Sequence, residues 1–218
     1  MSLLKLEAVT YYCETPKLVS LSHLDAALGR LREQHCREGP PILAQFFLPS
    51  VEFIERLARY LVGRRHSTIL EVGAGVGALA DFLSIQSPLA NCQVRAVDIA
   101  PALAQIVNPR SIVEEMDYRK ALVKFQPDCV LCAFMEPRHD WTEDFVQARV
   151  NEYILIGFED HPLCVCGVPA SWKPRPGYER QDLESLAQYT ACYLGSGVRP
   201  QVVSFQRSVM RSESSIKA

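Results

Sequence analysis

Three observations predict an α/β protein with a doubly wound, mostly parallel seven-stranded sheet. Short β-rich runs alternate with amphipathic helical segments from residue 68 onward, which is typical of βαβ units. The run at residues 128–133 is apolar throughout, as expected of a strand covered on both faces. Two β-like runs near the C-terminus, residues 189–194 and 198–204, are joined at Gly195-Ser196-Gly197 and predict an antiparallel hairpin.

Five short runs are expected to form the parallel part of the sheet. They cover residues 68–72, 93–97, 111–115, 128–133 and 152–158. The helices between them are expected at residues 76–83, 101–106, 118–125 and 142–148. A Pro-rich loop at residues 169–176 and a short helix near residues 181–186 precede the hairpin.

Residues 1–64 are expected to form an N-terminal helical extension or cap. Leucines recur at helical spacing from residue 18 to residue 31, and a second helix is expected from Pro49-Ser50 to Gly63. The α/β domain then covers residues 65–207, and a serine-rich, charged and flexible tail covers residues 208–218.

Composition excludes several classes of protein. The formal net charge of −2 gives no global attraction to nucleic acid, so a nucleic-acid partner is not expected. No N-terminal signal and no apolar run of membrane-spanning length are evident, so no membrane partner is expected. Several of the eight cysteines lie within apolar runs, which favours reduced thiols in a cytoplasmic protein over a disulfide framework. The oligomeric state is not predicted.

A glycine-rich loop follows the first strand of the α/β domain. Gly73, Gly75 and Gly77 allow positive φ angles and a close approach of the backbone to a ligand. The helix that starts after them would offer free N–H groups to a pyrophosphate or to a carboxylate. Because Gly73-x-Gly75-x-x-Ala78 also fits a relaxed dinucleotide fingerprint, the glycines alone leave two classes of cofactor open.

Two acidic residues bear on the choice of cofactor. Glu71 precedes the glycines on the strand, where a carboxylate would repel a pyrophosphate and attract the ammonium and sulfonium of S-adenosylmethionine. Asp98 ends the second strand and could accept hydrogen bonds from both ribose hydroxyls of either cofactor. A dehydrogenase normally needs a separate substrate domain, and too few residues remain for one.

Residues 65–207 resemble the class I S-adenosylmethionine-dependent methyltransferases, which have a Rossmann-like fold. Glu71-x-Gly73-x-Gly75-x-Gly77 matches the first motif of that family, and Val94-Arg95-Ala96-Val97-Asp98 matches the second. Glu115-Met116-Asp117-Tyr118 looks like the family's acidic loop that meets adenine, and residues 128–135 look like its fourth strand and exit loop. The resemblance implies S-adenosyl-L-methionine as cofactor. The residues it implies for cofactor binding are Glu71, Gly73, Ala74, Gly75, Gly77, Asp98, Ile99, Met116, Asp117, Ala133 and Phe134.

Candidate catalytic and substrate-binding residues follow the fourth and fifth strands, because ligands bind at strand C-termini in open α/β sheets. His139 is a candidate general base, with Glu136 or Asp140 nearby to orient it, and His161 is a second candidate. Glu136, Trp141 and Trp172 are candidate substrate contacts. Solvated loops and core packing are the competing interpretations of these residues.

The loop after the fourth strand constrains the acceptor only partly. Met135-Glu136-Pro137-Arg138 departs from the motif of family members that methylate amino groups of nucleobases or glutamine amides. We therefore expect methyl transfer to a small molecule or a protein side chain. A non-catalytic methyltransferase-like binding or scaffold protein is the alternative, and a nicotinamide-dependent oxidoreductase is the least favoured. Cys164-Val165-Cys166 with His161 lacks a second pair at recognised spacing, so no metal site is expected there.

Overall fold

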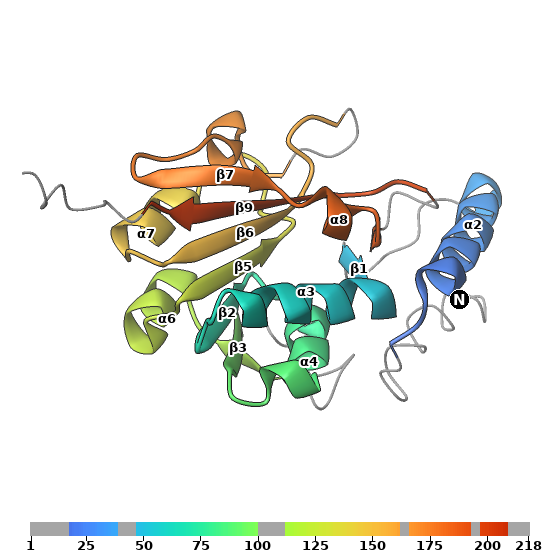
Figure 1. The fold of residues 1–218 in the computed structure, drawn as a ribbon. Helices are drawn as coiled ribbons and strands as arrows, with labels where there is room; N and C mark the ends of the chain where they lie inside the picture. The colour runs from blue at the N-terminus through green and yellow to red at the C-terminus, as the bar shows by residue number, and fades with distance from the viewer. Residues whose placement is uncertain (1–17, 39–46, 100–111, 162–165, 193–196, 209–218) are drawn as a thin grey trace, which may run out of the picture.

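The computed structural model describes five stretches of the chain. They are residues 18–38, 47–99, 112–161, 166–192 and 197–208 (Figure 1). The expected helix at residues 101–106, the Gly195-Ser196 turn and most of the tail lie outside the described residues. No helix in the described stretches is long and apolar enough to cross a membrane.

A seven-stranded sheet forms the centre of the molecule, in the order β4-β3-β2-β5-β6-β9-β7 (Figure 1). Its strands are β2 (Thr68–Val72), β3 (Gln93–Asp98), β4 (Val113–Glu115), β5 (Cys129–Ala133), β6 (Glu152–Gly157), β7 (Tyr178–Asp182) and β9 (Gln201–Arg207). Pairings among β2 to β6 are parallel, and β9 runs antiparallel to both β6 and β7. The structure thus confirms the predicted doubly wound, mostly parallel seven-stranded sheet with an antiparallel C-terminal strand.

The predicted C-terminal hairpin is wrong in its pairing. Within the described residues, the run at residues 189–194 contributes strand β8 (Thr190–Cys192), which pairs with β1 (Phe47–Pro49) in a separate two-stranded sheet. The antiparallel partners of β9 are instead β6 and β7. Strand β7 is the outermost strand of the sheet, so most of its side chains are polar and few are buried. Its sequence therefore lacks the alternation of apolar and polar residues that predicts a strand.

Helices cover both faces of the sheet. One face carries α3 (Val51–Gly63), α4 (Ala78–Ser84) and α8 (Glu184–Ala187), whose apolar side chains pack on Ile69, Leu131 and Ile154. The other face carries α6 (Tyr118–Phe125) and α7 (Thr142–Gln147), which pack on Leu70, Val130 and others. Neighbouring residues of one strand, such as Ile69 and Leu70, therefore lie in different cores. This is the period-two pattern of a strand that is buried on both sides.

The two described N-terminal helices are placed differently, since α3 packs in a main core and α2 in a small separate cluster. Helix α3 begins after Ser50, whose side chain accepts a hydrogen bond from Phe53 N, and it shares the first core with the sheet. Helix α2 (Leu21–Glu38) lies beyond the end of the sheet, where Leu24 and Leu28 pack against Ala191 of β8 (Figure 1). The proposed division at residue 64 stays a prediction. Two short 3₁₀ helices complete the fold: η1 (Ser87–Leu89) and η2 (Pro169–Trp172).

Candidate cofactor and acceptor site

The glycine-rich loop joins β2 to α4 at the carboxyl edge of the sheet. Gly73, Gly75 and Gly77 have φ angles of 63°, 54° and 77°, which lie in the left-handed region that side chains other than glycine rarely adopt. The Ala74 amide donates to Val97 O at 3.1 Å and so ties the loop to the end of β3. The loop therefore needs its glycines for backbone conformation, as the sequence predicts.

Asp98 ends β3 beside this loop, and its Oδ2 accepts a hydrogen bond from the Gly75 amide at 2.9 Å. The main-chain oxygen of Asp98 also accepts from the Met116 amide at 2.9 Å, which joins the ends of β3 and β4. Ile99, the next residue, is 73% exposed. The carboxylate of Asp98 thus lies at the glycine loop, and the contacts of Asp98 with ribose and of Ile99 with the cofactor stay predictions.

Glu71 lies beneath the loop and is only 3% exposed. Its Oε2 accepts a hydrogen bond from the Ala80 amide at 2.8 Å, in the first turn of α4, whose N-cap residue is Gly77 and has no side chain to offer. Burial raises the pKa of Glu71 to about 8; the hydrogen bond from Ala80 opposes this rise, and Asp81 and Asp98 add to it.

This burial changes the sequence argument about Glu71. That argument treated the side chain as a charged group, whereas a pKa of about 8 leaves its neutral form dominant at pH 7 in the described structure. The sequence argument also expected free N–H groups at the start of α4 to bind an anionic group of the cofactor. One of them, the Ala80 amide, already donates to the Glu71 carboxyl group. A nearby cation would favour the ionised form of Glu71.

Trp141 covers the other side of the loop. Its ring stacks on Tyr118 with centroids 4.8 Å apart, and the Tyr118 hydroxyl donates to Asp144 Oδ2 at 2.5 Å. Trp141 Cη2 and Cζ3 would lie 3.0 Å from a Cβ placed on Gly73. Stacking on Tyr118 therefore holds the indole against the glycine loop. The predicted contact of Trp141 with a substrate stays a prediction.

Replacing Gly73 with alanine is expected to destabilise the protein more than the same change at Gly75. Both residues have positive φ, which costs alanine about 1 kcal/mol or more. Only at Gly73 does the new methyl group also press on the Trp141 ring, since a Cβ at Gly75 meets nothing within 4 Å. Urea unfolding of the two variants measures the difference. Equal losses of stability would mean that Trp141 does not restrain the loop.

Asp117 and Met116 follow β4 but are already engaged by the protein. The Asp117 side chain caps α6 and accepts from Arg119 N at 2.9 Å and from Lys120 N at 3.4 Å. The Met116 amide donates to Asp98 O. The N-cap role, one of the two interpretations open from the sequence, is thus present, and the adenine contacts of both residues stay predictions.

The loop after β5 places His139 in solvent. His139 and Glu136 have side chains 54% and 65% exposed, and His139 Nδ1 lies 3.5 Å from Glu136 Oε2. Asp140 is not available to orient the histidine, because it is paired with Arg175 and accepts from the Thr142 hydroxyl and amide. Of the two proposed orienting acids, Glu136 pairs with His139, whereas Asp140 is engaged by Arg175 and Thr142.

His161 lies against the aromatic residues at the ends of β5 and β6. Its ring centroid is 4.7 Å from that of Phe158, and Phe158 is 5.9 Å from Phe134 in an edge-to-face arrangement. Phe134 has a φ of 57°, an uncommon conformation for a large side chain, directly after β5. The structure thus brings the His161 ring and the Phe134 ring to one aromatic cluster, at the edge that also holds the glycine loop.

Trp172 occupies the core beneath this edge. It is 1% exposed, and its Nε1 donates to Cys166 O at 2.7 Å. The competing interpretation from the sequence, a tethered surface loop, does not describe this buried position, and the role of Trp172 as a substrate contact stays a prediction. Cys166 is also buried, while Cys164 and Phe46 lie outside the described residues. Sequence reasoning missed Arg175 and Tyr118, which hold the Asp140 and Trp141 side chains, because their partners are 35 and 23 residues away in the chain.

Comparisons with solved structures support the fold. A "putative O-methyltransferase" from Klebsiella pneumoniae is 15% identical, with 95% of this chain and 97% of that chain covered and a TM-score of 0.51. Cofactor-bound Rv0187 from MTB is 14% identical, with 93% and 95% covered and a TM-score of 0.50. No protein-family model matches the sequence, and no curated protein matches it. The strand order, the antiparallel β9 and these two similarities show that the chain has the Rossmann-like fold of the class I methyltransferases.

Proposed function

We propose that the protein binds S-adenosyl-L-methionine at the carboxyl edge of the sheet and transfers its methyl group to a small molecule or a protein side chain. The observation that carries the proposal is the hydrogen bond from Gly75 to Asp98, which sets a carboxylate at the end of β3 beside a loop of three left-handed glycines. The two similar folds support it, since one is named an O-methyltransferase and the other is cofactor-bound.

The donor set at this edge fits the cofactor. Asp98 offers two carboxylate oxygens to ribose hydroxyls, and the exposed Ile99 offers apolar surface to a planar base. The exposed backbone of Gly73 and Gly75 admits a ligand without side chains in the way. When bound, the cofactor supplies an electrophilic methyl group on a sulfonium.

The chain's own residues would bind, align and shield the reactants. Trp141 and the aromatic cluster of Phe134, Phe158 and His161 supply apolar walls at this edge, and excluding water while aligning two reactants accounts for much of such a barrier reduction. His161 and His139 are the candidate groups for taking a proton from the acceptor. His139 is exposed, so the acceptor would have to cover it.

Titration calorimetry with S-adenosylmethionine tests the proposal. The wild-type protein is expected to bind it, and Asp98→Ala to bind at least about ten-fold more weakly, because charge-assisted hydrogen bonds are worth about 1.5–3 kcal/mol each. Asp182→Ala is the matched control, since Asp182 also ends a strand but lies in β7, at the opposite side of the sheet from β3. Asp98→Asn, which keeps one oxygen for the Gly75 amide, separates loss of charge from collapse of the loop.

Several outcomes would contradict the proposal. No binding by the wild-type protein, or equal binding by Asp98→Ala, would remove the cofactor site. Preferential binding of NADH would favour an oxidoreductase. Binding of S-adenosylmethionine without turnover of labelled methyl groups on any extract would favour a binding or scaffold protein, for which the solvent-exposed His139 and the engaged Asp140 already provide some support.

A further inference from the structure

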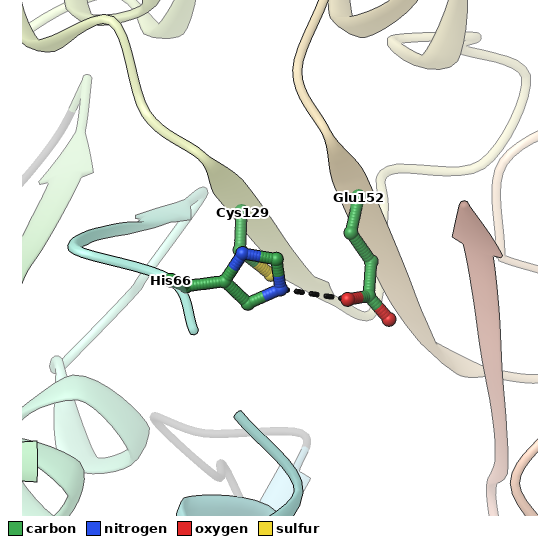
Figure 2. A group of neighbouring side chains, drawn as sticks. All are labelled: His66, Cys129 and Glu152. Carbon is green, nitrogen blue, oxygen red and sulfur yellow. Dashed lines mark hydrogen bonds and ion pairs between the residues drawn. The ribbon is translucent and has the colours of Figure 1, made fainter. Parts of the chain in front are cut away.

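Three potential metal ligands meet at the amino edge of the sheet, opposite the glycine loop. His66 lies just before β2, Cys129 is the first residue of β5, and Glu152 is the first residue of β6. Because these strands are parallel neighbours, their first residues lie side by side. Figure 2 shows the three side chains converging, with the Cys129 sulfur beside the His66 ring.

The three side chains are buried and close enough to share one ion. His66 is 6% exposed, and Cys129 and Glu152 are 0% exposed. One ligand atom from each residue lies within 4.8 Å of the others. His66 Nε2 and Glu152 Oε2 already bond at 2.7 Å (Figure 2).

Neighbouring hydrogen bonds hold the carboxylate in place. Glu152 Oε1 accepts from the Tyr60 hydroxyl at 2.6 Å and from the Ser204 hydroxyl. Oε2 also accepts from Arg64 Nε at 3.3 Å. Such outer hydrogen bonds orient the ligands of metal sites and set their basicity.

We propose that His66, Cys129 and Glu152 form a binding site for a divalent ion of the zinc type. A thiolate, an imidazole and a carboxylate together suit Zn²⁺ and Co²⁺, whereas Ca²⁺ and Mg²⁺ prefer oxygen ligands alone. Thiolate and carboxylate together carry two negative charges, which balance a divalent cation. The proposal is independent of the methyl-transfer site, because the cluster lies at the other edge of the sheet.

Binding at this cluster has a definite proton balance. Burial raises the pKa of the Cys129 thiol well above its usual value, so the thiol is protonated without metal. The sulfur–metal bond forms as the S–H bond breaks, and the proton leaves to solvent. His66 Nε2 breaks its hydrogen bond to Glu152 and binds the ion as its proton moves to Nδ1, so the neutral ring releases no proton to solvent. Arg64, whose side chain is 40% exposed, can turn toward solvent as the ion takes its place.

The competing interpretation is a hydrogen-bonded cluster that binds no ion. Each oxygen of Glu152 is already satisfied by two donors, so the fold does not require a metal. The two possibilities differ at Cys129, whose thiol makes a long contact of 4.0 Å to the carbonyl oxygen of Val130 and no hydrogen bond to His66 or Glu152. A metal would use this sulfur, and a hydrogen-bonded cluster would not.

Titration of the metal-free full-length protein with Co²⁺ tests the proposal. We expect one equivalent to produce a near-ultraviolet thiolate-to-cobalt band, Zn²⁺ to abolish it, and buffer-dependent calorimetry to report proton release. Cys129→Ser is expected to lose the band and to bind at least about ten-fold more weakly. Cys132→Ser is the matched control, because Cys132 is equally buried in the same strand and faces the other core.

The possible results distinguish metal binding at this cluster from binding at other cysteines and from no binding. The proposal is wrong if the wild-type protein shows no cobalt–thiolate band, or if the band survives in Cys129→Ser, which would place the ion on other cysteines. If Cys129→Ser does not fold, as judged by circular dichroism, His66→Gln provides the same test. Zn²⁺ is expected to raise the melting temperature of the wild-type protein and of Cys132→Ser but not that of the ligand variants.

Discussion

Replacing Glu152 with alanine is expected to lower the free energy of unfolding by about 3–5 kcal/mol, the range seen when one partner of a buried ion pair is removed. The Glu152 carboxylate is fully buried and accepts hydrogen bonds from His66, Tyr60, Arg64 and Ser204. Its removal leaves the Tyr60, His66 and Ser204 donors without their acceptor. Urea unfolding monitored by circular dichroism measures the loss.

A surface ion pair provides the control for Glu152. Glu114 pairs with Lys124 at 2.8 Å with both side chains well exposed, so Glu114→Ala is expected to cost less than about 1 kcal/mol. Comparable losses in the two variants would mean that the buried network adds no more than a surface pair. Chelation of metal before the measurement keeps this test separate from ion binding.

Acidification should weaken the same network. Burial tends to raise the pKa of Glu152, but hydrogen bonds from His66, Ser204 and Tyr60 outweigh it and hold the pKa below its ordinary value. A depressed carboxyl pKa contributes stability above the pKa of the unfolded chain, and that contribution is lost as the pH falls through the folded value. The Glu152→Ala variant should therefore approach the wild-type protein in stability under acid conditions.

Glu71 should show the opposite dependence on pH, and we expect Glu71→Gln to become steadily more favourable relative to the wild-type protein between about pH 4.5 and pH 8. The folded protein holds the Glu71 proton up to about pH 8, whereas the unfolded chain releases it near 4.5, the ordinary pKa of a glutamate. Across that window the unfolded state binds fewer protons, so stability falls as the pH rises. At about 1.4 kcal/mol per pH unit, the full window of about 3.5 units corresponds to roughly 5 kcal/mol.

The slope with pH, rather than the offset at one pH, is the result that matters for Glu71. Glutamine keeps an oxygen for the Ala80 amide but does not titrate, so its own contribution is flat. Glu115→Gln, at an exposed position at the end of β4, supplies the control. Parallel stability curves for Glu71→Gln and the wild-type protein would show that Glu71 ionises in the folded state as it does in the unfolded chain.

The parallel sheet could be predicted because its signals are local. Strand β5 is a continuous apolar run, β2 and β6 are mostly apolar, and Gly73, Gly75 and Gly77 mark the loop after β2 by type alone. Strand β7 could not be found this way, because an outermost strand buries few of its side chains. The pairing of β8 with β1 was likewise hidden, since three-residue strands far apart in the chain carry no periodicity.

The candidate site was predictable only where residue type determines the role. Asp98 at a strand end and the glycines were identified from their spacing, but the ionisation of Glu71 depends on burial, which the sequence does not express. The cluster of His66, Cys129 and Glu152 brings together residues from three separate strand ends, 63 and 23 positions apart. No spacing motif could mark it, because its geometry arises only when the strands pair.

The position of β9 also constrains how the chain reaches this structure during synthesis. Among the described strands β9 emerges last from the ribosome, yet it lies between β6 and β7 and is the only strand in the described residues that pairs with β7. Until residues 201–207 have been synthesised, β6 and β7 lack the strand that pairs with both of them. Glu152 then also lacks the hydrogen bond from the Ser204 hydroxyl. The nascent protein therefore passes through a stage in which β6 is an open sheet edge and β7 has no partner strand, the stage at which chaperones would matter most.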